Sequence, residues 1–486
     1  MTQVVILAES GETGPYGAGS SGRVVHSRGG RDFRLSVERM AEKEIVVAAS
    51  HSRDEALSVS GIPGVLPVQI DAGAPNLRLH DAGVARMPDP ATLQKAVDEG
   101  SFSSLASLFQ LRPSDVRARH QARFKSVLEA IRKEGGLCIY GAGNIGRQAL
   151  DAARRADIPI KQILDRNPSR FGGQLDGVPI RSPEHVVSGD VVVIGVGNGV
   201  AEIEKALQKS AHPVFLGLSE LNAVSRRPGE PETDYIDDLF ANRCRYVSLY
   251  GLLDDAESRE TLSALVQHRL TLSNDSLQQV RVKNHDQWFA PFLSGKANEV
   301  FVDGGAFDGD TVEGYIKSRG AGYGAIHAFE IDPDIAKRAR ERVAGYRDVT
   351  VHNVGLSDRQ DDLAYRRTGG TDGTLSLPEF KLEEHGDRSD LVRISRLDDV
   401  VQEAVDFIKL DVEGEEARAI AGAEKHILRS SPILAVAAYH KASDIWDLPR
   451  RLLDLTPGYR LRLRHYTDCA YETVIYATRA SPNSDL

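Results

Sequence analysis

Residues 300–311 read Val300-Phe301-Val302-Asp303-Gly304-Gly305-Ala306-Phe307-Asp308-Gly309-Asp310-Thr311. The apolar run at the start predicts a buried parallel strand. The glycine-rich turn that follows predicts that the backbone comes close to a ligand, because glycine has no side chain. A second predicted strand, Ala325 to Phe329, ends at Glu330, about 25 residues after the turn. In a nucleotide-binding βαβ unit, an acid at this position accepts hydrogen bonds from ribose hydroxyls.

The turn differs from a dinucleotide-binding turn, which reads G-x-G-x-x-G and places a pyrophosphate at a helix N-terminus. It carries three carboxylates, Asp303, Asp308 and Asp310. These would repel a pyrophosphate, but they suit a cofactor that carries an ammonium and a sulfonium group, and S-adenosylmethionine is the candidate. The alternative is an acidic turn in another kind of α/β domain.

Three further motifs follow in order. They are Val354-Gly355-Leu356-Ser357-Asp358, Phe407-Ile408-Lys409-Leu410-Asp411-Val412-Glu413-Gly414-Glu415 and Tyr439-His440-Lys441. Together with Phe301-Val302-Asp303-Gly304-Gly305-Ala306, this string resembles the FkbM family of S-adenosylmethionine-dependent methyltransferases. The resemblance covers roughly residues 235–478. It implies an α/β domain with the seven-stranded class I methyltransferase fold, a doubly wound Rossmann-like sheet, at residues 296–480.

The strand pattern fits this fold. Predicted strands end near Val302, Phe329, Asn353, Leu410 and Ala438, with helices between them, as a parallel sheet requires. The last two predicted strands, 460–464 and 473–477, are joined by a short polar loop. They should form an antiparallel hairpin at the edge of the sheet.

The resemblance and the fold imply a cofactor site at the C-terminal ends of the strands. Asp303 is expected to organise the turn and to receive the methionine ammonium, directly or through water. Gly305 and Gly309 are expected to let the backbone approach the cofactor. Glu330 should hold the ribose, and Ser357 and Asp358 should lie at the adenine edge; a turn or cap role is the alternative for Asp358. The full predicted set is Asp303, Gly304, Gly305, Ala306, Phe307, Gly309, Glu330, Ser357 and Asp358.

The candidate catalytic residues are Lys409, Asp411, Glu413 and His440. Methyl transfer requires alignment of the acceptor and removal of its proton. His440 is the better free base, since histidine titrates near neutral pH. Asp411 and Glu413 could share a divalent cation with the acceptor oxygen. The structural alternatives are a helix-start carboxylate for Glu413, a hydrogen-bonding role for His440 and a strand-face lysine paired with an acid for Lys409.

A second, smaller Rossmann-like domain is predicted at residues 136–225. The strand Leu137–Tyr140 runs into Gly141-Ala142-Gly143-Asn144-Ile145-Gly146, and a second strand ends at Asp165. This is the context that a nucleotide-binding turn requires. Asp165-Arg166-Asn167-Pro168 and Gly177-Val178-Pro179-Ile180 make the region resemble the N-terminal domain of bacterial sugar acyltransferases, which implies a nucleotide or nucleotide-sugar ligand. Gly141, Gly143, Gly146 and Asp165 are its candidate binding residues. The alternative is a scaffold that keeps the glycine turn for helix packing.

The remaining regions are assigned more coarsely. Residues 1–90 are expected to form a small β-containing or partly flexible region, with strands near 4–8, 44–49 and 65–70 and a glycine-rich loop at 11–30. Residues 91–135 should be a helical connector and 226–234 a linker. Residues 235–295 should form a helical cap that covers the pocket and contributes to the acceptor site.

Composition excludes several classes of protein. The chain has 486 residues and a formal net charge of −10, which argues against a nucleic-acid binder. No apolar run approaches 18 residues, so no transmembrane helix is expected, and the N-terminus has too short an apolar core for a signal peptide. Cys138, Cys244 and Cys469 are too far apart for a disulfide framework or a zinc site. A reduced, cytoplasmic setting fits.

The leading hypothesis is an S-adenosylmethionine-dependent methyltransferase that O-methylates a hydroxyl of a sugar or glycan. The acceptor would be a small molecule or glycan, with a nucleotide-sugar as one option. Other hydroxylated natural products, N-methylation and a homo-oligomeric state stay open. The alternative is a nucleotide-sugar-binding scaffold with an inactive methyltransferase-like half. A third hypothesis is an NAD-dependent oxidoreductase built on Gly141–Gly146.

Overall fold

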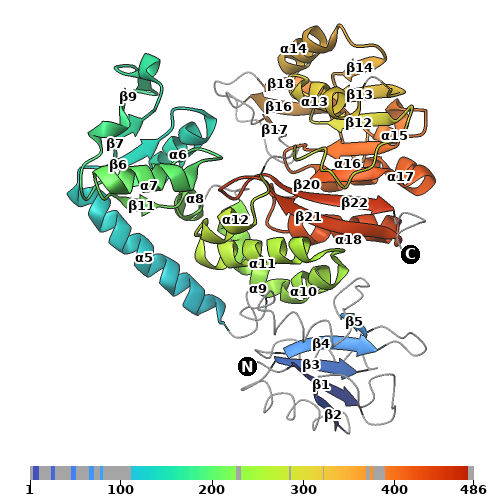
Figure 1. Cartoon of the computed structure of the whole chain (residues 1–486), viewed down its shortest axis with the longest axis horizontal. Helices are drawn as coiled ribbons and strands as arrows, with labels where there is room; N and C mark the ends of the chain where they lie inside the picture. The colour runs from blue at the N-terminus through green and yellow to red at the C-terminus, as the bar shows by residue number, and fades with distance from the viewer. Residues whose placement is uncertain are drawn as a thin grey trace. The chain divides into compact units, whose positions relative to one another are not determined.

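The computed structural model describes residues 111–225, 231–283, 286–320, 322–367, 373–375 and 389–479, with Leu105 and five strands between Val4 and Leu79. The chain divides into two compact units. The first is Met1–Arg281 with Thr467–Ala470, and the second is Val282–Tyr466 with Tyr471–Leu486. Each unit contains a mainly parallel β-sheet with helices beside it, six-stranded in the first unit and seven-stranded in the second, as labelled in Figure 1.

The five N-terminal strands form one sheet in the order β2-β1-β3-β4-β5. Its strands are β1 Val4–Glu9, β2 Arg23–Ser27, β3 Ile45–Ser50, β4 Val65–Ile70 and β5 Leu77–Leu79. The three predicted strands agree closely with β1, β3 and β4. The prediction of a loop throughout 11–30 is wrong at Arg23–Ser27, where a Val-Val run pairs in parallel with β1. The glycine-rich residues 11–22 and the connector residues 91–104 and 106–110 lie outside the described part of the chain.

The second sheet of the first unit has the order β11-β10-β6-β7-β9-β8. It is parallel except for the last pair, in which β8 runs antiparallel to β9. Its strands are β6 Leu137–Tyr140, β7 Ile160–Leu164, β8 Gln174–Leu175, β9 Val178–Arg181, β10 Val191–Ile194 and β11 Val214–Leu216. The helices beside it are α6 Asn144–Arg155, α7 Val200–Ser210 and α8 Leu218–Ser225. The four residues of β6 and the four of β10 are all buried, as the centre of a parallel sheet requires.

Helix α5, Pro113–Lys133, precedes this sheet. Pro113 begins the helix, because proline is favoured in the first turn, where the missing N–H has no partner to lose. Val127 and Ile131 of this helix are buried. In the described part of this unit, four more helices follow: α9 Pro231–Ala241, α10 Arg243–Leu252, α11 Ala256–Thr271 and α12 Asp275–Val280.

The predicted linker and cap therefore have different bounds. Helix α9 begins at Pro231, so residues 231–234 are helical, and residues 226–230 lie outside the described residues. The helices end at Val280 and group with the first unit. Their role as a cap over the second unit's pocket stays a prediction.

The second unit contains a seven-stranded sheet in the order β14-β13-β12-β19-β20-β22-β21. Its strands are β12 Val300–Gly304, β13 Ala325–Phe329, β14 Val349–His352, β19 Phe407–Leu410, β20 Ile433–Ala437, β21 Tyr459–His465 and β22 Thr473–Arg479. The first five are parallel, and β22 is antiparallel to both of its neighbours. The predicted class I methyltransferase fold with its terminal hairpin is confirmed, and Figure 1 shows that hairpin at the opposite edge from β14.

Within the described residues, six helices lie between these strands. They are α13 Asp310–Arg319, α14 Pro333–Val343, α15 Leu397–Val400, α16 Glu416–Gly422, α17 Glu424–Ser430 and α18 Asp444–Leu455. Phe301 of β12 stacks on Tyr315 of α13 with ring centroids 4.3 Å apart. Phe289 packs edge-on against both rings. These aromatic contacts pack the middle of α13 against β12.

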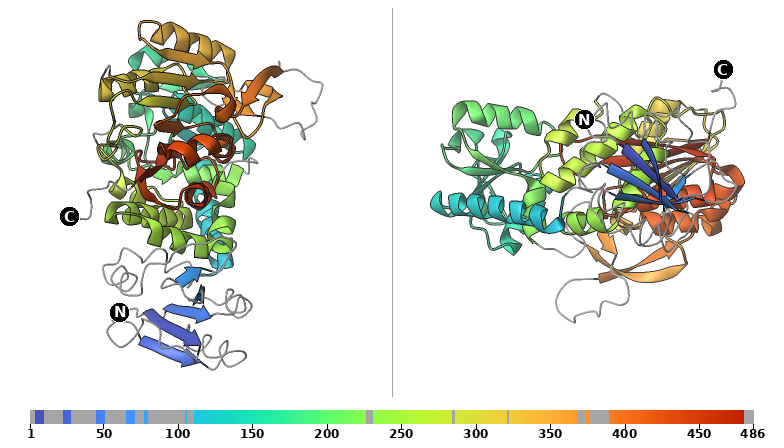
Figure 2. Two further views of the ribbon diagram at one scale, coloured as in Figure 1. Left: turned by 90° about the vertical axis from the view of Figure 1, so that its right-hand side faces the viewer. Right: turned by 90° about the horizontal axis from the view of Figure 1, so that it is seen from below.

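A small four-stranded sheet was not predicted. It has the order β15-β18-β16-β17 and lies between β14 and β19 in the sequence. Its strands are β15 Gly355–Leu356, β16 Asp361–Arg367, β17 Gly373–Leu375 and β18 Ser389–Ser395. Figure 2 shows this sheet, in orange, extending from the side of the larger one. Its polar composition hides it from a search for apolar runs.

Candidate active site

The turn after β12 is packed against the end of β19. Gly305 has φ of +75°, and a Cβ atom added there would lie 1.8 Å from the carbonyl oxygen of Asp411. A Cβ atom at Gly304 would lie 2.8 Å from the Leu410 side chain. Gly309, with φ of +88°, begins α13, and a Cβ atom there would lie 3.0 Å from Val343 of α14.

These contacts give the glycines a structural reason. That Gly305 and Gly309 also let the backbone approach a cofactor stays a prediction, and their nearest neighbours within the protein are the Asp411 carbonyl and Val343. Their φ angles and close contacts both require glycine. Gly304 and Gly305 therefore allow the ends of β12 and β19 to lie side by side, which places Asp411 beside the turn, whereas Gly309 allows the start of α13 to approach α14.

A buried ion pair joins the same two strands. The Nζ atom of Lys409 lies 3.0 Å from Oδ1 of Asp303, and the two side chains are 2% and 0% exposed. Lys409 also donates hydrogen bonds to the carbonyl oxygens of Gly304 (3.1 Å) and Gly305 (2.6 Å). It lies 5.0 Å from the centre of the Trp288 ring.

The charges of this pair follow from its surroundings. Burial lowers the pKa of Lys409, but the carboxylates of Asp303 and Asp411 outweigh burial and raise that pKa above its ordinary value. Burial raises the pKa of Asp303 to about 6, against the opposing effect of Lys409. Lys409 is thus a buried cation that braces the turn, which matches the structural alternative and leaves it no proton-accepting role. Asp303 is fully buried and pairs with Lys409, and its expected roles in organising the turn and receiving an ammonium group stay predictions.

Glu330 lies at the end of β13, beside the turn. Its Oε2 accepts a hydrogen bond from the backbone N–H of Phe307 (3.0 Å), and its Oε1 accepts one from Asp332 (2.8 Å). Phe307 has φ of +46°, which is unusual for a residue with a side chain. The N–H of Ala306, a buried residue, donates to the carbonyl oxygen of Phe329 at 2.9 Å. Burial raises the pKa of Glu330 to about 7.

Ser357 and Asp358 follow β15, at the start of the small sheet. The Ser357 N–H donates to the carbonyl oxygen of Ser395 at 2.9 Å, and its hydroxyl donates to Oδ1 of Asp358 at 3.3 Å. Asn353, which the sequence analysis did not select, donates from its amide to the carbonyl oxygens of Glu330 and Ile331, both at 2.9 Å. Asn353 thus ties the segment after β14 to the end of β13. The adenine-edge assignment of Ser357 and Asp358 stays a prediction.

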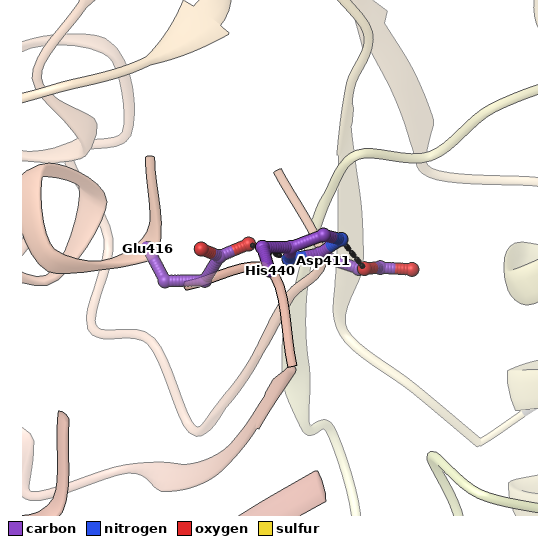
Figure 3. A group of neighbouring side chains, drawn as sticks. All are labelled: Asp411, Glu416 and His440. Carbon is purple, nitrogen blue, oxygen red and sulfur yellow. Dashed lines mark ion pairs between the residues drawn. The ribbon is translucent and has the colours of Figure 1, made fainter. Parts of the chain in front are cut away.

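The candidate catalytic residues form a cluster at the ends of β19 and β20. The Nε2 atom of His440 lies 3.6 Å from Oδ1 of Asp411 and 3.5 Å from Oε2 of Glu413. The Nδ1 atom of His440 lies 3.0 Å from Oε1 of Glu416. Figure 3 shows the imidazole between the carboxylates of Glu416 and Asp411. Tyr439 adds a hydrogen bond from its hydroxyl to Oδ1 of Asp411 at 3.2 Å.

Glu416 is a functional candidate that sequence reasoning missed. It has no exposed surface, and its Oε1 accepts hydrogen bonds from the N–H groups of Val412 (2.9 Å) and Gly414 (3.3 Å). Glu413 between them has φ of +54°, and Gly414 has φ of +92°. The sequence does contain a signal, because Glu416 follows Asp411 and Glu413 closely. However, three of the four residues 413–416 are glutamates at the start of a helix, and the sequence does not show which of them faces the site.

The charge of His440 differs from the expectation. Burial lowers the pKa of His440, but Glu416, and then Glu413 and Asp411, raise it to about 10. The imidazole is therefore positively charged near pH 7 in the ligand-free protein. The sequence-based interpretation of His440 as a free base is corrected, because a neutral imidazole is not the stable form among these carboxylates.

Two further acids complete the cluster. Burial, followed by repulsion from Glu416, raises the pKa of Asp444 to about 7. Burial, followed by repulsion from Asp411, raises the pKa of Glu472 to about 7. Oε2 of Glu472 accepts a hydrogen bond from Gln287 at 2.7 Å. Carboxyl groups therefore crowd this cluster, and Asp444 and Glu472 are only partly ionised near pH 7.

The glycine turn of the first unit has a similar construction. A Cβ atom at Gly146 would lie 1.8 Å from the carbonyl oxygen of Gly141, whereas one at Gly143 would meet nothing within 4 Å. Asp165 accepts hydrogen bonds from the N–H groups of Ala142 (3.0 Å) and Asn167 (2.8 Å), as Glu330 does in the second unit. Asp165 also pairs with Arg170 at 2.8 Å.

That ion pair distinguishes the two acids. Burial raises the pKa of Asp165, but the hydrogen bonds from Asn167 and Ala142 and the contact with Arg170 outweigh it and lower the pKa. Among the described residues, no cation pairs with Glu330 in this way. Gly141 and Gly146 serve helix packing, and a nucleotide or nucleotide-sugar ligand for the Gly141, Gly143, Gly146 and Asp165 set stays a prediction.

The geometry of the second unit agrees with the comparisons to known proteins. Residues 303–472 match the model of the methyltransferase FkbM domain. They cover the turn, Glu330 and the whole cluster around His440. The second unit therefore contains a methyltransferase domain of the FkbM type.

Two particular proteins resemble the chain. The 2-O-methyltransferase NoeI of Sinorhizobium fredii is 27% identical over 186 residues, which are 35% of this chain and 75% of NoeI. The crystal structure of a methyltransferase FkbM from Methylobacillus flagellatus superposes with a TM-score of 0.56 at 21% identity, and it covers 76% of this chain and 100% of that one. The similarity to the Methylobacillus structure is a similarity of fold, and the superposed part of this chain is longer than residues 303–472. The resemblance of residues 136–225 to sugar acyltransferases has no counterpart among these matches.

Within the described residues, no helix combines the length and the apolar character needed to cross a membrane.

Proposed function

We propose that this protein transfers the methyl group of S-adenosylmethionine to a hydroxyl of a sugar, a glycan or a related natural product. The observation that carries the proposal is the position of Glu330. It is a carboxylate without a cationic partner among the described residues, bound to the N–H of Phe307 in the turn after β12. In a class I fold this position suits hydrogen bonds from the two ribose hydroxyls.

The acceptor would bind at the neighbouring strand ends. In the sheet order, β12 stands between β13, which carries Glu330, and β19, which leads to Asp411. A cofactor that spans β13 and β12 would therefore direct its methyl group toward Asp411 and Glu413. These carboxylates would orient the acceptor hydroxyl and receive its proton during in-line displacement at the methyl carbon. The sulfonium charge would be stabilised by the surplus of acids around His440.

The match to NoeI supports oxygen as the atom methylated, because that protein is named a 2-O-methyltransferase. A sugar acceptor is our inference from the FkbM resemblance and from the resemblance of residues 136–225 to the N-terminal domain of sugar acyltransferases. Neutral hydroxyls also suit a site rich in hydrogen-bond acceptors.

The test is transfer of a labelled methyl group from S-adenosylmethionine to a panel of monosaccharides, nucleotide-sugars and oligosaccharides by the full chain. We expect incorporation into at least one acceptor, in a product stable to base as an ether is. We expect Asp411→Asn to lower the rate at least about 100-fold, the usual scale for loss of acid–base assistance. Label recovered only in an amine product would contradict O-methylation, and equal rates for Asp411→Asn and wild type would contradict the role of Asp411.

A further inference from the structure

The two ring nitrogens of His440 face different carboxylates. Glu416 meets Nδ1 at 3.0 Å, while Asp411 and Glu413 approach Nε2 at 3.6 Å and 3.5 Å. Asp411, Glu416 and His440 each offer one ligand atom within a group no wider than 4.8 Å. Figure 3 shows this order of side chains, with the imidazole in the middle.

The distances at Nε2 are long for hydrogen bonds and suit a shared ion. The usual N–H···O distance is about 2.7–3.2 Å, and neither ring nitrogen of His440 makes a hydrogen bond with acceptable geometry to the described residues. Two ligands that each lie about 2.0–2.2 Å from one ion are roughly 3–3.6 Å apart at octahedral to tetrahedral angles. The separations of Nε2 from both carboxylates are at the upper end of this range.

Glu416 provides an independent observation. Its side chain has no exposed surface, and its Oε2 has no hydrogen-bond partner among the described residues. Its Oε1 is turned toward Nδ1 of His440 and toward the backbone N–H of Val412. A carboxylate that holds one ring nitrogen, so that the other faces a metal, is the usual outer partner of a metal-binding histidine.

We propose that Nε2 of His440 and the carboxylate of Asp411 bind one divalent cation, that Glu413, whose Oε2 lies 3.5 Å from Nε2 but which is outside the group of three above, turns toward the ion as a further ligand, and that Glu416 positions the imidazole for it. Mixed imidazole and carboxylate donors suit Mn²⁺ or Zn²⁺. On binding, the Nε2–H bond breaks, its proton goes to solvent and the lone pair forms the bond to the metal; no oxidation state changes. The ion's role rests on the proposed function: it would lower the pKa of an acceptor hydroxyl, for which carboxylates alone are weak bases.

The experiment uses the full chain, stripped with EDTA and dialysed, and titrated with Mn²⁺ alone while the signal of free Mn²⁺ is followed by electron paramagnetic resonance. Zn²⁺ is then tested by competition. We expect one ion per chain, with a dissociation constant on the order of micromolar. His440→Gln and Asp411→Asn should weaken binding at least about 100-fold, and Glu413→Gln at least about tenfold. Glu416→Gln should weaken it about 10- to 100-fold, the range for an outer partner.

The second unit offers a matched control. His327 and Glu403 form another histidine–carboxylate pair, with Nε2 and Oε1 2.7 Å apart. His327→Gln and Glu403→Gln should bind Mn²⁺ like the wild type, because neither residue belongs to a candidate metal-binding group of three side chains in the described residues. Thermal melting confirms that each variant is folded, and if Glu416→Gln is not, His440→Gln carries the test.

Two results would overturn the cation site. One is failure of the wild type to bind either Mn²⁺ or Zn²⁺, in which case the imidazolium itself is the counter-charge of the cluster. The other is binding that His440→Gln and Asp411→Asn leave unchanged. S-adenosylmethionine binding, measured on the same samples, separates the two proposals. If the wild type binds S-adenosylmethionine but binds neither Mn²⁺ nor Zn²⁺, the cation site is refuted and the proposed function is not.

Discussion

Lys409 and Asp303 form an ion pair of 3.0 Å with almost no exposed surface, and it joins the two strands on which the site is built. Removal of one partner would leave the other charge buried and unpaired, which typically costs about 3–5 kcal/mol. Lys409→Met should therefore destabilise the second unit by about that amount. Both tryptophans of the chain, Trp288 and Trp446, lie in this unit, so their fluorescence during urea unfolding reports on it.

The surface pair Lys296–Asp406 is the control, because it has a similar distance of 2.6 Å but a lysine that is 62% exposed. Lys296→Met should cost no more than about 1 kcal/mol. In Lys409→Met combined with Asp303→Asn, much of the stability should return. Equal costs for the two lysine variants would show that the buried pair does not brace the sheet.

Gly305→Ala tests the contact between the turn and Asp411. The new methyl group would overlap the Asp411 carbonyl oxygen at a backbone conformation that alanine rarely adopts. We expect a loss of about 3 kcal/mol or more in stability and at least a tenfold loss in S-adenosylmethionine affinity, because the turn must move. Gly345→Ala is the control, since its Cβ atom would meet nothing within 4 Å. Similar behaviour of the two variants would refute the packing role of Gly305.

Glu330 gives a pH dependence of defined sign. Its pKa is raised from 4.5 to about 7 in the free protein, so the folded state binds this proton more tightly than the unfolded state does. Its contribution to stability is present below about pH 4.5 and is lost as pH rises through about 7, up to about 3 kcal/mol. The melting temperature of the free wild type should therefore fall more between pH 5 and 8 than that of Glu330→Gln.

Cofactor affinity should change in the opposite direction. The ribose hydroxyls donate to the carboxylate, so S-adenosylmethionine should bind more tightly as pH rises from about 6 to 8. Calorimetric titrations at several pH values should give a flatter profile for Glu330→Gln. A wild-type profile as flat as that of the variant would contradict the ribose-binding role of Glu330.

In the first unit, Asp468 caps helix α7. Its Oδ2 accepts hydrogen bonds from the N–H groups of Gly199 (2.7 Å) and Val200 (3.0 Å), and its Oδ1 pairs with Arg281 at 2.7 Å. Asp468→Ala should destabilise α7 by about 2 kcal/mol, since a charged cap and a half-buried ion pair are both lost. Hydrogen exchange of the α7 amides measures this directly.

The exposed pair Arg112–Asp115 is the comparison for Asp468. Asp115→Ala should leave the exchange of α7 unchanged, because it removes only an exposed ion pair at another helix. Faster exchange of α7 in both variants would mean that the cap is not specific.

The sequence predicts the large sheets well because their strands are buried on both faces. Val300 to Val302 and Phe407 to Leu410 are continuous apolar runs, and this pattern has few other interpretations. Glu330 was found in the same way, by its place after a strand. The small sheet escaped because Asp361–Arg367 is a polar strand, without the alternation or apolar run that identifies one.

The site was less predictable because its chemistry depends on contacts across the fold. The carbonyl oxygen that requires glycine at position 305 belongs to Asp411, more than a hundred residues later. The charge of His440 depends on Glu416 and on burial, which no local pattern contains. A catalytic lysine and a structural lysine would both fit the position of Lys409 in the sequence. Only its 3.0 Å contact with Asp303 identifies Lys409 as the partner in a buried ion pair.

We propose that the second unit binds S-adenosylmethionine through Glu330. The most direct measurement is calorimetric titration of the full chain with S-adenosylmethionine and S-adenosylhomocysteine, with Glu330→Gln and the control Glu403→Gln in parallel. We predict one site per chain for both ligands, retained in Glu403→Gln and weakened at least about tenfold in Glu330→Gln. A folded wild-type protein that binds neither ligand, or that binds them equally well after Glu330→Gln, would contradict the claim.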